Sequence, residues 1–116
     1  MLAIGHFMVG FSIVLAVIIV LRLRSAYGFL AAFGGGIWAM IPDVYWIDWF
    51  PDQYIPLARE LHGSNWANLF FFHRIIDLAY LDDSPTDVVI PILIGFLITG
   101  VYCYIDGKNR GNQVKP

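Results

Sequence analysis

Two side chains able to do chemistry, His73 and Asp77, lie four residues apart in the stretch 69–80, which is apolar at nearly every position except these two and Arg74. On a helix, this spacing places both side chains on the same face, one turn apart. An imidazole and a carboxylate in that relation can bind one metal ion or can act as an acid–base pair. A structural ion pair, in which Asp77 satisfies His73 or Arg74, would show the same pattern, so this pair alone does not decide between the readings.

The composition is that of an integral membrane protein with one domain, residues 1–116. Hydrophobic residues make up 59% of the chain, charged residues make up 14%, and the mean hydropathy is +0.67. Soluble domains are usually about 45–50% apolar and about 25% charged. The net charge of −2 gives no basic surface for nucleic acid, so the expected partners are membrane lipids and not nucleic acid.

The apolar pattern predicts an all-α membrane protein with three transmembrane helices, at about residues 1–21, 26–41 and 88–105. A further apolar segment, at about residues 66–81, carries His73 and Asp77. It is short for a fourth span, and a fourth span would separate the two basic clusters of the chain. We therefore expect this segment to be an interfacial or re-entrant helix at one end of the bundle.

The charge distribution predicts the orientation in the cell membrane. Basic residues gather in the turn at residues 22–24 and in the C-terminal segment 106–116, whereas residues 42–87 hold eight acids and two bases. The positive-inside rule then places the turn and the C-terminus in the cytoplasm. The N-terminus and residues 42–87 are expected outside, which brings the start of the first span, the end of the second and the interfacial helix together.

This topology predicts a metal site formed by His6, Asp43, His73 and Asp77. Imidazoles and carboxylates together suit a divalent cation, with zinc favoured over manganese or iron. Such an ion can lower the pKa of a water and generate hydroxide for hydrolysis. His62 lies on the same side, but we expect it in an exposed loop, so that its replacement by alanine should cost little metal affinity.

A run of glycines, Gly34–Gly36, lies in the second predicted span. Within a membrane, glycines allow the backbones of two helices to approach closely. The run is therefore a candidate packing face, either within the bundle or for another membrane subunit.

Three short motifs occur in order: Gly5-His6, then Pro42-Asp43 at the end of a glycine-rich helix, then His73-Arg74. In this order they resemble the family of small membrane-bound, metal-dependent hydrolases distantly related to zinc-dependent phospholipase C. Tyr45 stands where that family has a second aspartate, and His73 matches either its His-Arg segment or its later His-x-x-x-Asp. The resemblance implies hydrolysis of a phosphoester or lipid-like substrate by a metal-activated water. Arg74 is then a candidate contact for a substrate phosphate, or the partner of an acid.

The alternative is a non-enzymatic membrane subunit, in which the same histidine, aspartate and arginine groups form a structural polar network. That network would hold the interfacial helix on the bundle. A proton-relay role is disfavoured, because no acid lies in the middle of a predicted span.

Overall fold

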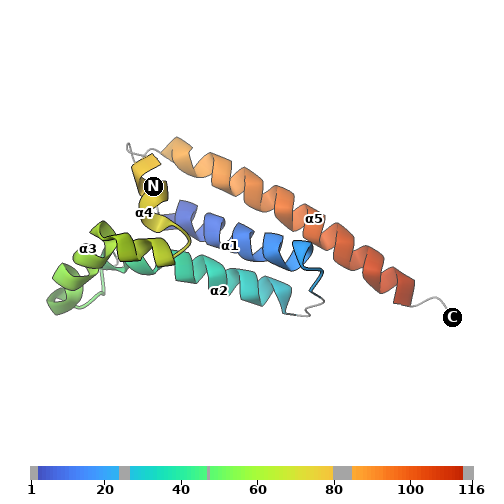
Figure 1. Cartoon of the computed structure of the whole chain (residues 1–116), viewed down its shortest axis with the longest axis horizontal. Coiled ribbons are helices and arrows are strands. Elements are labelled where there is room, and N and C mark those ends of the chain that lie inside the picture. Colours follow the sequence, from blue (N-terminus) through green and yellow to red (C-terminus); the bar gives the residue numbers. More distant parts are fainter. Residues whose placement is uncertain (1–2, 24–26, 47, 80–84, 114–116) are drawn as a thin grey trace.

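The computed structural model describes residues 3–23, 27–46, 48–79 and 85–113, and these form an all-α structure. Three longer helices run side by side (Figure 1): α1 (Ala3–Val20), α2 (Gly28–Met40) and α5 (Val89–Gln113). Helix α1 packs against both α2 and α5, and it contributes the buried side chains Leu15 and Ile18. It is therefore the central helix of the bundle.

Shorter helical elements cover the end of the bundle where α1 begins (Figure 1). We call them the cap: η1 (Ile41–Trp46), η2 (Asp52–Tyr54), α3 (Ile55–Gly63), η3 (Asn65–Leu69) and α4 (His73–Ala79). A 3-10 turn, η4 (Pro85–Val88), then leads into α5. Pro42 does not stop the second helix outright, because the chain continues from α2 into η1 as a tighter helix.

Glycines bring α1 and α2 into close contact. A Cβ atom at Gly10 would overlap the carbonyl oxygen of Gly35 and lie 2.7 Å from the Cβ of Ala39. A Cβ at Gly36 would lie 2.5 Å from the ring of Phe7. Two glycines of the Gly34–Gly36 run thus pack against α1 of the same chain, whereas a Cβ at Gly34 would meet nothing within 4 Å. Gly34 is exposed and takes no part in this close α1–α2 contact.

Gly35→Leu is expected to lower the thermal unfolding temperature of the detergent-solubilised protein by several degrees. Its side chain would have to enter space that Val14 and the backbone of Gly10 already fill. Gly34→Leu is the matched control, because it adds the same side chain one residue away on an exposed position. Equal unfolding temperatures for the two variants would contradict the proposed tight α1–α2 contact.

Two helical segments are long and apolar enough to cross a membrane: Ala3–Val20 and Thr86–Asn109. Helix α2 has only 13 residues, which corresponds to about 20 Å of helix. The expected all-α architecture is confirmed, and two of the three predicted spans have the required length and composition.

The predicted continuous helix at residues 66–81 is wrong, because the structure divides it into η3 and α4. Phe71 and Phe72 separate the two elements with φ angles of 53° and 61°, a left-handed conformation that interrupts a right-handed helix. Residues 80–81, the last two of the predicted helix, lie outside the described residues.

Ser64 begins one element of the cap. Its hydroxyl caps η3 by accepting a hydrogen bond from the backbone N–H of Trp66 at 3.2 Å. At the C-terminal end of the bundle, α5 continues through the polar segment that starts at residue 106 and ends at Gln113.

Candidate metal centre

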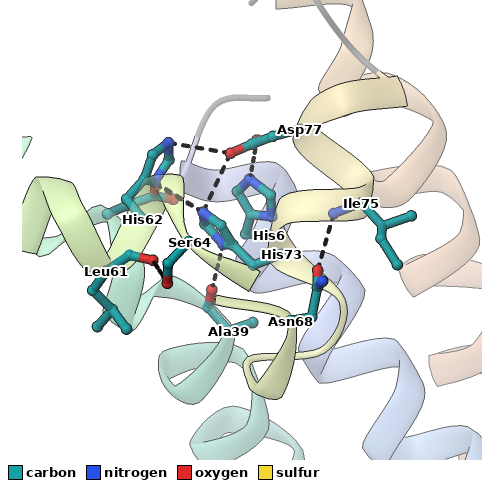
Figure 2. A network of polar contacts seen from close by, with 10 residues as sticks. His6, Ala39, Leu61, His62, Ser64, Asn68, His73, Ile75 and Asp77 are labelled. Atoms are coloured by element: carbon teal, nitrogen blue, oxygen red, sulfur yellow. Dashed lines mark hydrogen bonds and ion pairs between the residues drawn. The ribbon is translucent and has the colours of Figure 1, made fainter. Parts of the chain in front are cut away.

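Five ionisable side chains converge at the junction between the bundle and the cap. They come from four elements: His6 from α1, Asp43 from η1, His62 from α3, and His73 and Asp77 from α4. Figure 2 shows the three imidazoles and the carboxylate of Asp77 facing one another. His6, Asp43 and His73 are buried, and the other two are half-buried. The sequence-based expectation that distant segments meet at one end therefore describes the observed geometry.

Asp43, His62 and His73 form the most regular group of ligand atoms. The Nδ1 atom of His62 lies 3.2 Å from Oδ1 of Asp43 and 3.2 Å from Nε2 of His73. The third side of this triangle, from His73 Nε2 to Asp43 Oδ1, is 3.3 Å. Ligands about 2.0–2.1 Å from a tetrahedral zinc ion are about 3.3–3.4 Å apart, so these three atoms already have the spacing of a zinc ligand face.

Asp77 connects this triangle to His6. One carboxylate oxygen, Oδ1, lies 2.8 Å from Nε2 of His6, which is a short hydrogen bond. The other oxygen, Oδ2, lies 3.3 Å from Nε2 of His73 and 3.3 Å from Nε2 of His62. The ring of His6 also stacks on the ring of His73, with centroids 3.9 Å apart. His6, His73 and Asp77 thus form a second group of three atoms that could hold an ion, and it shares His73 with the first.

A backbone hydrogen bond on Nδ1, the ring nitrogen that is not in the cluster, fixes the ring orientation of His73. Its Nδ1 atom lies 3.2 Å from the backbone carbonyl oxygen of Ala39, to which it donates a hydrogen bond (Figure 2). With the proton held on Nδ1, the neutral imidazole presents the lone pair of Nε2 to the site. This is the arrangement in which histidine usually ligates metals in proteins.

The cap positions His73 through its own backbone. The side-chain oxygen of Asn68 accepts a hydrogen bond of 3.1 Å from the backbone N–H of Ile75, so Asn68 caps the first turn of α4. The left-handed residues Phe71 and Phe72 directly precede His73. Such conformations cost free energy and tend to occur at functional sites, and here they turn α4 so that its first residue points inward.

The donor set fits a divalent cation. The second oxygen of Asp43, Oδ2, is buried and has no hydrogen-bond partner among the described residues. A buried carboxylate oxygen without a partner is costly, and a cation would compensate for that cost. Two carboxylates also balance the charge of one divalent ion, and three imidazoles with two carboxylates suit zinc, manganese or iron.

The expectation that His62 lies in an exposed loop is wrong. His62 is in the last turn of α3, its side chain is 27% exposed, and it contacts Asp43, His73 and Asp77. Its burial depends on the packing of α3 against η1, which the local sequence pattern does not indicate. Arg74, the candidate phosphate contact, follows His73 on α4 and is half-buried.

Hydrogen bonds shift the pKa values of two members of the cluster. Burial alone would lower the pKa of His73, but hydrogen bonds with Asp43 and Asp77 outweigh it and raise the pKa from 6.5 to about 9. Burial alone would raise the pKa of Asp77, but hydrogen bonds with His6 and His73 outweigh it and hold the pKa well below its ordinary value. Without a metal, His73 is therefore an imidazolium at neutral pH.

These shifts predict how metal affinity depends on pH. A metal ion must displace the proton on His73, so apparent zinc affinity should fall about tenfold for each pH unit below about 9. An ordinary histidine would begin to compete only below about pH 6.5. Zinc competition titrations between pH 6 and pH 9 measure this, and an affinity that stays constant across the range would contradict it.

The metal-free fold has a pH dependence of its own. Since the pKa of His73 is raised, its contribution to stability is present below pH 6.5 and is lost as pH rises through about 9. Asp77 has a lowered pKa, so its contribution is present above its ordinary pKa and is lost in stronger acid.

Comparison of the chain with protein-family models, with curated proteins and with solved structures found no match.

Proposed function

We propose that this chain is a small integral membrane protein that binds one divalent metal ion, zinc in preference to manganese or iron. It uses the ion for hydrolysis of a phosphoester or lipid-like substrate. The observation that carries the proposal is the triangle of Asp43, His62 and His73 ligand atoms, with sides of 3.2–3.3 Å. Asp77 and His6 complete the set on one side of this triangle.

The exposed apolar surface of the bundle supports a membrane location. Only 11% of the apolar stretch in residues 86–109 is buried, whereas the core helix of a soluble protein would be mostly buried. Large side chains such as Leu93, Phe96 and Leu97 are 62–71% exposed on α5. A surface of this kind is stable against lipid and costly against water.

We further propose that α2 is the third span and that the cap and the N-terminus lie outside, with the C-terminus in the cytoplasm. The acids in residues 42–87 and the bases in the turn 22–24 and in the segment 106–116 support this orientation. Labelling of Asp52→Cys in intact cells, after Cys103→Ser, tests it. A cysteine that reacts only after the cytoplasm is opened would reverse the orientation.

The number of ions follows from the chemistry of the ligands. His73 has a single nitrogen, Nε2, for both groups, and a nitrogen lone pair ligates one ion. One divalent ion also neutralises the two carboxylates, whereas a second would leave a buried excess of positive charge. We therefore propose one ion per chain, shared by the two groups through His73.

The reaction class comes from the resemblance to metal-dependent hydrolases together with the ligand set. When bound, the ion would supply Lewis-acid polarisation and a water of lowered pKa. Asp77 lies at the half-buried edge of the cluster, where its carboxylate could accept a hydrogen bond from a water on the ion and orient that water. Arg74 is a candidate contact for a substrate phosphate.

Hydrolysis of a chromogenic phosphodiester by the zinc-loaded, detergent-solubilised protein tests the reaction class. Activity that is lost on chelation, that returns with zinc and that is absent from Asp77→Asn would support it. A protein that binds zinc but hydrolyses neither this reporter nor phospholipid would contradict the hydrolase assignment and leave the metal site in place.

A structural polar network is the second candidate, and one observation favours it. His6 and Asp77 already form a hydrogen bond of 2.8 Å, and this bond joins α1 to α4 without any ion. In that case the cluster would fasten the cap to the bundle, and the purified protein would contain no metal.

A further inference from the structure

An arginine of the cap lies on the same face of α3 as the proposed ligand His62. Arg59 precedes His62 by three residues, which places the two side chains on neighbouring positions of the helix surface. The guanidinium carbon of Arg59 lies over the ring of Tyr45, 5.8 Å from its centroid, which is within the range of a cation–π contact. Tyr45 in turn packs edge-on against His62, with ring centroids 5.4 Å apart. Tyr45 thus lies between the arginine and the metal ligand.

The charges around this arrangement favour an anion. A divalent ion would neutralise Asp43 and Asp77, so further positive charge near the site remains available for a substrate. Arg59 is exposed, and among the described residues its contact is with an aromatic face and not with a carboxylate. A guanidinium over a ring keeps N–H donors available for a planar or tetrahedral oxyanion.

Tyr45 can add a neutral donor. Its phenol carries an O–H donor, and its ring is half-buried beside His62.

We propose that Arg59, held over Tyr45, is a binding residue for an anionic phosphoryl group that is also in contact with the metal ion. This inference rests on the proposed function, because it needs an ion in the cluster. It assigns the recognition of the anion to α3 and η1, in addition to the contact considered for Arg74 on α4.

The test is the binding of inorganic phosphate to the zinc-loaded, full-length protein in detergent, measured by calorimetry. Arg59→Ala should weaken phosphate binding by about tenfold or more, because it removes a charge-assisted hydrogen bond. Arg59→Lys should recover part of the loss, since it keeps the charge without the fork of donors. Tyr45→Ala should also weaken binding, whereas Tyr45→Phe should retain the effect of Arg59.

Lys108→Ala is the control, because it removes one positive charge from an exposed position on α5. It should leave phosphate binding unchanged, and all these variants should retain zinc affinity. Glycerol phosphate in water and phosphatidic acid in mixed micelles carry the same phosphoryl group. Comparison of their affinities shows whether the anion is presented from water or from lipid.

Two results would overturn the proposal in distinguishable ways. If Arg59→Ala retains zinc and binds phosphate as the unaltered protein does, the anion site is wrong and the metal site stands. If the unaltered protein binds no zinc, the proposed function fails, and the anion site fails with it.

Discussion

Replacement of His73 by alanine is expected to lower zinc affinity by about 100- to 1000-fold. Structural zinc sites bind with about 10–16 kcal/mol through roughly four ligands, so one ligand accounts for about 2.5–4 kcal/mol. His73 belongs to both groups of candidate ligand atoms, so neither group is complete without it. Competition against a chromophoric zinc chelator in detergent measures the change.

Ile75→Ala provides the control for this variant. Ile75 lies on the same helix, its side chain is 56% exposed, and the substitution likewise truncates a side chain to alanine. Zinc affinity should be unchanged in Ile75→Ala, and the helical circular dichroism of both variants should match that of the unaltered protein. A His73→Ala protein that keeps its helical signal and binds zinc normally would exclude this cluster as the metal site.

His62→Ala should reduce zinc affinity by about 100-fold, and His6→Ala should reduce it by only about tenfold. The reason is the geometry of the ligand atoms. His62 Nδ1 completes a triangle with sides of 3.2–3.3 Å, whereas His6 Nε2 is already engaged in a 2.8 Å hydrogen bond with Asp77. The role of His6 within the five-residue cluster is then chiefly to orient Asp77.

The comparison of these two variants locates the ion within the cluster. Both remove an imidazole from the same network, and each of the two histidines belongs to only one of the two groups. The reverse ranking, with His6→Ala the more damaging, would place the ion between His6, His73 and Asp77. Equal and small effects would contradict both locations.

The sequence predicted the residues of the bundle end better than it predicted the cap. His6 lies near the start of the first apolar segment, and Asp43 follows the end of the second. The topology alone therefore brings both to the same end of the bundle as His73. The apolar length and the low charge of α1 and α5 also follow directly from composition. These features depend on averages over many residues, which a single local conformation does not change.

The geometry within the cap depends on local conformations that have little signal in the sequence. Nothing in the aromatic run at residues 70–72 shows that Phe71 and Phe72 adopt left-handed conformations, and this break divides the predicted helix. The role of His62 depends on how α3 packs against η1. That packing is tertiary, so a half-buried ligand and an exposed loop residue have the same local pattern.

The metal content of the protein tests the central claim most directly. The full chain is purified in mild detergent without chelator and analysed by elemental mass spectrometry, with His73→Ala prepared in parallel. We expect close to one zinc ion per chain in the unaltered protein and a near-complete loss in the variant. Absence of any stoichiometric divalent metal from the unaltered protein, even after incubation with zinc at pH 8, would contradict the metal site and leave the structural polar network as the account of this cluster.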